Sequence, residues 1–224
     1  MKSDSSKLAI FDTFKTKNQQ LTGEATRQRA IITTLATQES PTEKTRTSLS
    51  QRIADKNGLI WKNLYSGVFR DLDEILIPLK LVEEEGRLPL RRGPKALQEK
   101  GIPYYKLTQS GVLVALSIKE IKDRHTLLDK FFSYSNSQEK EFQGIILKLS
   151  KISPKFTFSL FEKYVRVFCE GKFENLLPFT FANLKSVSDE SLQVQKEILE
   201  AFSNLSKADK EKTIDLVKRL VENS

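Results

Sequence analysis

The 224-residue sequence contains only one cysteine, Cys169, and only one histidine, His125. A single cysteine cannot form an internal disulfide bond, and a lone thiol is typical of proteins in a reducing cytosol. The usual zinc clusters and Cys/His nucleophile pairs need more such residues, so the sequence predicts no metal site and no catalysis of that type. We expect His125 to lie at the surface and Cys169 to be buried beside Phe168.

Long apolar segments and nucleotide-binding motifs are also missing from the sequence. No stretch of about 18 uncharged apolar residues occurs, so we expect no transmembrane helix and no membrane partner. The first residues, Met1–Lys7, are not followed by the apolar segment of a secretory signal, and we expect a cytoplasmic protein. Neither a P-loop nor a GxGxxG motif is present, so we predict no cofactor and no enzymatic activity.

The charge of the chain is positive and unevenly distributed. The sequence has 37 Lys and Arg residues against 29 Asp and Glu residues, a formal net charge of +8. Residues 1–122 hold 21 basic and 14 acidic residues, whereas residues 123–224 hold 16 and 15. A basic N-terminal half indicates a polyanionic partner, with nucleic acid the first choice, or simply a well-hydrated surface.

Three amphipathic helices are predicted before residue 80. The first begins after the N-cap Thr22 and runs to about Gln38, close to a Ser-Pro pair that ends it. A short second helix fits residues 47–54, and a third fits residues 60–76. The apolar residues that recur at helical spacing in the third helix, and so form its predicted inner face, are Val68, Leu72 and Ile75.

A strand, a basic arm and a second strand are predicted after these helices. Residues 81–86 favour a strand, the proline-containing basic segment 87–95 follows, and residues 102–107 return as a strand before Thr108 opens another helix. A helix beside a cationic hairpin suits a reader of duplex DNA, because the helix fits the major groove and the hairpin reaches neighbouring phosphates.

Two motifs in this region resemble the winged helix-turn-helix superfamily, in particular MarR-like and PadR-like transcriptional regulators. Leu81–Glu83 matches the Leu-Val-Glu strand that follows the third helix of many such proteins, and Tyr105–Gly111 matches their Tyr-x-Leu-Thr-x-x-Gly junction. The resemblance covers about residues 24–122 and implies three helices, a two-stranded wing and DNA binding. The chain departs from the pattern at Lys80, where a glycine is usual, and its arm is longer than a minimal wing.

The third helix is the predicted recognition helix, because its first half carries polar and cationic side chains away from the inner face. The residues predicted to contact DNA there are Lys62, Asn63, Tyr65, Ser66 and Arg70. Asn and Arg can make paired hydrogen bonds to adenine and guanine, while Lys and Ser more often hold phosphates. The alternative is a solvated helix face, which Asp71, Asp73 and Glu74 favour for the second half.

Two further groups of residues are candidate phosphate contacts. The wing residues predicted to contact phosphates or the minor groove are Arg87, Arg91, Arg92, Lys95 and Lys100. A plain solvated loop is the alternative reading of that arm. The residues at the start of the second helix are Thr45, Arg46, Thr47 and Ser48. Free N–H groups there could hold a phosphate, and ordinary helix capping explains the same residues equally well.

The second half of the chain is predicted to be entirely helical. Residues 1–21 form an arm or short helix, residues 22–108 the winged domain, residues 109–134 one long connecting helix, and residues 135–224 a Phe-rich helical domain. Eleven of the 14 phenylalanines lie in residues 123–224. They are predicted to fill a helical core, to form a pocket for a small apolar ligand, or to form a dimer seam.

These patterns predict a mainly α protein, with an N-terminal winged helix-turn-helix followed by an all-helical region. The function that they favour is sequence-specific binding of double-stranded DNA by a homodimeric transcriptional regulator. The alternative is a protein–protein interaction module in a larger assembly, in which the Phe-rich half is the working surface.

Overall fold

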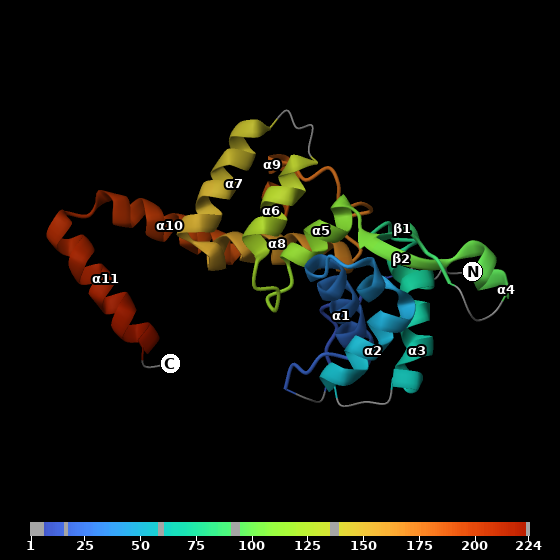
Figure 1. Ribbon diagram of the computed structural model, residues 1–224. Helices are drawn as coiled ribbons and strands as arrows, with labels where there is room; N and C mark the ends of the chain where they lie inside the picture. Colours follow the sequence, from blue (N-terminus) through green and yellow to red (C-terminus); the bar gives the residue numbers. More distant parts are fainter. Residues whose placement is uncertain (1–6, 16–17, 58–60, 91–94, 135–138, 223–224) are drawn as a thin grey trace. The chain divides into compact units, whose positions relative to one another are not determined.

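The computed structural model describes residues 7–15, 18–57, 61–90, 95–134 and 139–222 (Figure 1). Over these ranges the chain is mainly α-helical with one two-stranded antiparallel sheet, which confirms the predicted class. The chain divides into two units, Met1–Phe181 and Ala182–Ser224. None of the helices in these ranges is both long enough and apolar enough to cross a membrane.

The first unit begins with helices that pack against one another. α1 (Gly23–Thr37) starts as predicted, because Thr22 Oγ1 accepts a hydrogen bond from the Ala25 N–H at 3.1 Å. A short 3₁₀ turn, η1 (Pro41–Lys44), leads to α2 (Arg46–Asn57), which is longer than predicted. The large apolar residues that α1 and α2 bury are Ile31, Ile32, Leu35, Leu49 and Ile53.

The third predicted helix changes its winding half-way along. α3 (Trp61–Arg70) is α-helical, but the following segment, η2 (Asp71–Leu76), is π-helical. A π-helix has more residues in each turn than an α-helix, so the inward-facing position moves along the chain. Leu72 is buried as predicted, but the next buried residue is Leu76 and not the predicted Ile75.

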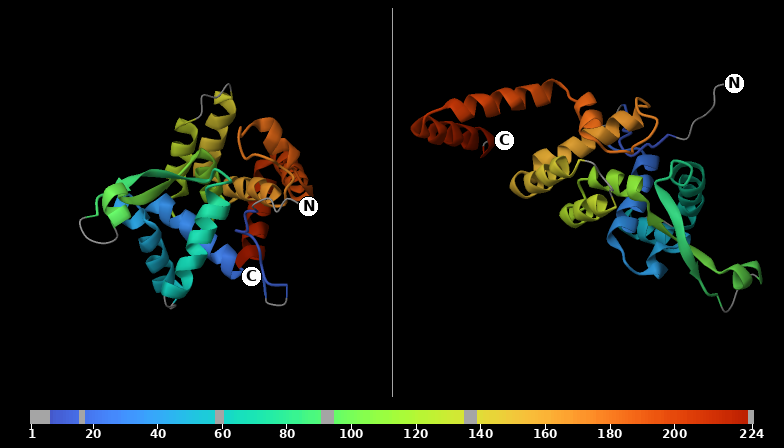
Figure 2. Two further views of the ribbon diagram at one scale, coloured as in Figure 1. Left: turned by 90° about the vertical axis from the view of Figure 1, so that its right-hand side faces the viewer. Right: turned by 90° about the horizontal axis from the view of Figure 1, so that it is seen from above.

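A hairpin follows the three helices, as predicted. β1 (Val82–Leu88) and β2 (Ile102–Leu107) pair in antiparallel orientation, with a bulge between Glu84 and Gly86. A short helix, α4 (Lys95–Lys100), lies between the strands, where the sequence predicted only an arm. The hairpin projects away from α1–α3 in both views of Figure 2. The end of the hairpin that carries α4 therefore lies away from the helical core.

Two helices stand where the sequence predicts one long connecting helix over residues 109–134. α5 (Gln109–Leu116) is buried along nearly all of its length. α6 (Arg124–Ser133) begins anew after Asp123, whose carboxylate accepts a hydrogen bond from the Thr126 N–H at 3.2 Å. The prediction of one long helix was wrong because residues 117–123 are not helical, and Asp123 then caps a new helix.

Phenylalanine side chains fill the space between the later helices of the first unit, which include α7 (Lys140–Ile152) and α8 (Pro154–Cys169). The Phe179 ring centre lies 5.2 Å from that of Phe161 and 5.8 Å from that of Phe131. Of the eleven phenylalanines in residues 123–224, only Phe181 is exposed in the part of the chain that the structure describes. The rings that belong to the first unit therefore form an internal core, and this unit extends well past the predicted boundary at residue 135.

The N-terminal segment is an arm that has no helix in its described residues. Leu8 and Ile10 are buried, so the arm is packed into the first unit. The guanidinium of Arg166 on α8 lies 4.2 Å from the centre of the Phe11 ring. The beginning of the chain is therefore held by a helix that comes far later in the sequence.

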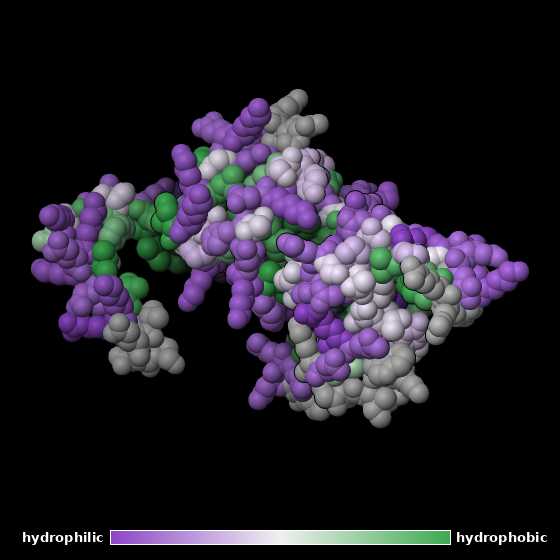
Figure 3. Space-filling model, in the orientation of Figure 1, coloured by the Kyte–Doolittle hydropathy of each residue, from purple (hydrophilic) through white to green (hydrophobic). Residues whose placement is uncertain are grey.

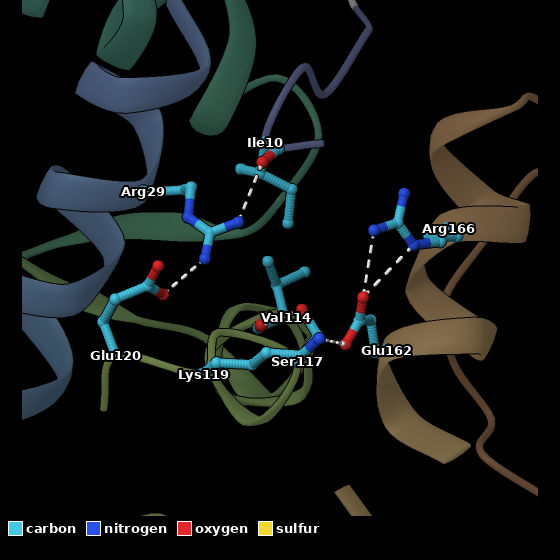
Figure 4. A network of polar contacts seen from close by, with 8 residues as sticks. All are labelled: Ile10, Arg29, Val114, Ser117, Lys119, Glu120, Glu162 and Arg166. Atoms are coloured by element: carbon cyan, nitrogen blue, oxygen red, sulfur yellow. Dashed lines mark hydrogen bonds and ion pairs between the residues drawn. The ribbon is translucent and has the colours of Figure 1, made fainter. Parts of the chain in front are cut away.

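Ion pairs join α1, the turn after α5 and α8 (Figure 4). Arg29 of α1 donates to the Ile10 carbonyl at 3.3 Å and pairs with Glu120 of the turn. Glu162 of α8 pairs with Lys119 of the same turn at 3.1 Å. The turn is thus fixed on both sides, and it links the three-helix part of the unit to the Phe-rich helices.

The second unit contains two long helices after the short α9 (Phe181–Ser186), namely α10 (Glu190–Asn204) and α11 (Lys207–Glu222). Each of the two long helices begins directly after a residue whose side chain caps it. Asp189 and Ser206 accept hydrogen bonds from backbone N–H groups three residues further on. Local capping chemistry therefore defines where these helices begin.

Candidate nucleic-acid interface

The outward face of α3 combines a hydroxyl group with a free cation. Ser66 and Arg70 are exposed about one helical turn apart, and Arg70 has no ion-pair partner among the described residues. Tyr65 is partly buried, and its ring centre lies 4.3 Å from that of Phe69, one turn further along the same helix. Its ring therefore packs within α3. The predicted recognition residues whose side chains fall outside the described part of the structure are Lys62 and Asn63.

Acidic residues that follow this face form ion pairs within the molecule. Asp71 is fully buried and accepts a hydrogen bond from Arg27 Nε at 2.7 Å. Asp73 pairs with Arg46 of α2, and Glu74 is exposed. Internal pairing therefore neutralises much of the negative charge that favoured a merely solvated face.

Arg46, a predicted phosphate contact, is engaged inside the molecule. Its Nε donates to Tyr105 Oη at 2.6 Å, its Nη1 donates to Asp73 at 2.9 Å, and its guanidinium lies 4.5 Å from the centre of the Phe69 ring. Burial raises the pKa of Tyr105, and the hydrogen bond from Arg46 opposes that rise. Arg46 thus joins α2, α3, η2 and β2, and so orients the hairpin against α3.

The other residues at the start of α2 make the contacts of a helix cap. Thr45 Oγ1 accepts a hydrogen bond from the Ser48 N–H at 3.3 Å, and Ser48 Oγ donates to the Thr42 carbonyl at 2.6 Å. Thr47 is exposed. Ordinary capping accounts for these contacts, so this helix start adds less to the interface than α3 and the hairpin do.

The strands of the hairpin carry ion pairs that the sequence analysis missed. Arg87 donates to Glu84 at 2.6 Å and 3.0 Å, and this hydrogen bonding raises the pKa of Arg87. The other pairs on the hairpin are Lys106–Glu83 and Lys44–Glu85, each at 3.4 Å. The sequence does hold a sign of these pairs. Three consecutive glutamates, Glu83–Glu85, stand just before the basic arm, and the sequence analysis did not consider that they could pair with nearby basic residues.

The far end of the hairpin carries free cations. Lys95 and Lys100 stand exposed at the two ends of α4, and neither has an ion-pair partner among the described residues. The surface at this end is hydrophilic (Figure 3, right). The predicted wing residues that lie outside the described residues are Arg91 and Arg92.

A groove of about 1000 Å³ lies between α1, the hairpin and α6. Buried apolar residues such as Leu35, Val112 and Leu127 contribute to its lining. The charged residues that line it are Glu39, Lys44, Glu83, Glu85, Lys106, Asp123 and Lys130. Both signs are present, and none of the predicted DNA-binding residues lines it, so it is separate from the candidate interface.

His125 and Cys169 take no part in this surface. His125 Nδ1 lies 3.3 Å from Ser150 Oγ, and its ring meets the edge of Phe158, so it is partly buried and not at the surface as predicted. Cys169 is buried as predicted, and burial raises the pKa of its thiol to about 12. Among the described residues, no three His, Cys, Asp or Glu side chains group so as to hold a metal ion.

No family model, curated protein or solved structure matches the chain. What this surface can bind therefore follows from its own residues. Exposed lysines such as Lys95 and Lys100 are suited to contacts with phosphates, and an exposed arginine on a helix, such as Arg70, is suited to hydrogen bonds with the edge of a base.

Proposed function

We propose that this protein binds double-stranded DNA in the cytoplasm and regulates transcription, with α3 in the major groove and the hairpin on the adjacent backbone. The proposed activity is binding without catalysis. The observation that carries it is that Arg70, Lys95 and Lys100 are exposed without partners among the described residues. The order of α1, α2, α3, β1 and β2 is that of a winged helix-turn-helix, which supports the same reading.

The distribution of charge between the units also supports this proposal. Residues 1–181 contain 30 basic and 21 acidic residues, a net charge of +9, whereas residues 182–224 contain 7 and 8. The whole positive excess therefore belongs to the unit that carries α3 and the hairpin. Such an excess attracts duplex DNA and releases its counterions on binding.

The proposed contacts differ in what they recognise. Arg70 can donate two hydrogen bonds to guanine, and Ser66 can bond either a base or a phosphate. Lys95 and Lys100 can reach phosphates, which carry no sequence information. Arg87 can join them only by exchanging its bond to Glu84 for a phosphate.

Binding to random-sequence duplex over a range of salt concentrations tests the proposal. If each protomer neutralises about 4 phosphates, log K falls against log salt with a slope of about −3.6. Absence of binding at low salt, or a slope near zero, rejects DNA binding and favours the interaction module.

Matched variants separate the roles of the helix and the hairpin. Arg70→Ala should relax the preference at particular base pairs, by about 1–3 kcal/mol, because one base-edge contact is lost. Lys95→Ala combined with Lys100→Ala should weaken binding to all sequences alike and reduce the salt slope by about 2.

The control is Lys148→Ala combined with Lys151→Ala, which removes the same charge from exposed positions on α7. This control should leave both the base preference and the salt slope close to those of the parent. An equal effect of the two double variants would mean that only total charge matters, and that the hairpin makes no specific contact.

A further inference from the structure

The second unit exposes apolar side chains along both of its long helices. On α10, Ile198 is 60% exposed and Leu199 is 66% exposed, and none of the residues of this helix is buried. The exposed large apolar residues of α11 are Ile214, Leu216 and Val217. Each helix therefore presents an apolar stripe that its own unit does not cover.

α10 and α11, of 15 and 16 residues, are close to the length at which helices are marginal alone, so packing of their apolar faces would stabilise them. Isolated helices shorter than about 12–15 residues are marginal in water, and most helical stability comes from packing of the apolar face. In the described part of the unit, α10 and α11 meet near their junction, where Lys210 donates to the Ser203 carbonyl at 3.0 Å, and do not pack along their length. Neither stripe is therefore covered by the other helix.

The charges beside the stripes indicate which partner fits. α10 carries three glutamates and one lysine, whereas α11 carries five basic and four acidic residues. The unit as a whole holds 7 basic and 8 acidic residues, so it offers no attraction to a nucleic acid or an anionic membrane. The acidic helix is instead complementary to the weakly basic helix of a second copy.

We propose that the second units of two copies of this chain associate, with α10 of each copy packed against α11 of the other. Two-fold symmetry forms this α10–α11 contact twice, once in each direction. Both apolar stripes are then buried, and each acidic α10 faces the weakly basic α11 of the other copy. Self-association goes beyond the proposed DNA binding and does not depend on it.

Sedimentation equilibrium of the full chain without DNA tests this proposal. Ile198→Glu places a charge in the stripe and should raise the dimer Kd at least about 100-fold, because two carboxylates would be buried unpaired. Gln193→Glu is the matched control, since it adds the same charge to an exposed position on the opposite face of α10. Both substitutions introduce a good helix former, so helix propensity does not explain a difference between them.

A dimeric parent, a dimeric Gln193→Glu variant and a monomeric Ile198→Glu variant would support the proposal. A parent that is monomeric at about 50 μM, or an Ile198→Glu variant as dimeric as the parent, would overturn it. The far-UV helical signal gives a second readout, because dilution of the parent below its Kd should reduce helix content. Duplex binding is measured separately, so failure of self-association and failure of DNA binding are distinguishable.

Discussion

Replacing Asp71 by alanine should cost the first unit about 3–5 kcal/mol of unfolding free energy, which is the usual effect of breaking a buried ion pair from one side. Arg27 binds this carboxylate through two hydrogen bonds, of 2.7 Å and 3.3 Å. The Asp71 side chain is 0% exposed and the Arg27 side chain is 15% exposed. The variant would leave a largely dehydrated guanidinium without its partner, and typical domains have only about 5–15 kcal/mol in total.

The surroundings of Arg27 leave little room for another arrangement. A Cβ atom at Gly67 would lie 2.8 Å from Arg27 Nε, so the side chain passes directly over the backbone of α3. Arg27→Met combined with Asp71→Leu removes both charges, and should destabilise less than Asp71→Ala alone. With the single variants Arg27→Met and Asp71→Leu these form a double-mutant cycle, whose coupling should be at least about 2 kcal/mol because the two residues are in direct contact.

Urea unfolding at pH 7 measures these differences, with the fluorescence of Trp61, the only tryptophan, as the probe. Glu83→Ala is the control, because its pair with Lys106 is about half exposed and should contribute only about 0–1 kcal/mol. An Asp71→Ala variant within about 1 kcal/mol of the parent would refute the reasoning.

Three further predictions concern single side chains. The Cys169 thiol, with a pKa of about 12 against an ordinary 9.0, should react with iodoacetamide at pH 8 about 1,000-fold more slowly than in urea, and rapid native labelling would contradict this. Because this pKa is raised by folding, its contribution to stability is lost as the pH rises from about 9 towards 12. Lys80 has a φ of 55°, so Lys80→Gly should raise the unfolding free energy by about 0.5–1 kcal/mol in a thermal melt, whereas Lys80→Ala should not. Glu84→Gln should strengthen duplex binding by releasing Arg87, and unchanged affinity would mean that Arg87 does not contact DNA.

The starts of helices, and the succession of strand, arm and strand in the hairpin, could be predicted because both depend on residues that lie close together in the sequence. Thr22 and Asp189 cap helices through hydrogen bonds to N–H groups three residues away, and such spacing is visible in a sequence. The sequence also shows that Lys80 stands where the winged-helix pattern usually has a glycine. The structure explains why a glycine would suit this position, because its backbone is in the left-handed conformation, which glycine adopts at the lowest energetic cost.

The elements that were missed depend on contacts between distant residues. The π-helical segment η2 begins at Asp71, whose partner Arg27 lies 44 residues earlier in the chain. Arg46 was predicted to be a phosphate contact, but its partner Tyr105 lies 59 residues away. Periodicity cannot reveal such pairs, so the candidate site could be predicted as a region but not residue by residue.

The contact between Phe11 and Arg166 has a consequence for the order of folding during synthesis. The two residues are 155 positions apart, and translation proceeds at about 5–20 residues per second. About 10–30 s therefore pass between the synthesis of Phe11 and that of Arg166 on α8. During this time α1, α2 and α3 can already pack through contacts between residues that are nearer in the sequence. The contact of the Phe11 ring with Arg166 is thus among the last in the first unit to form, whereas Ala9 and Ile10 can already bond to Gln28 and Arg29 of α1.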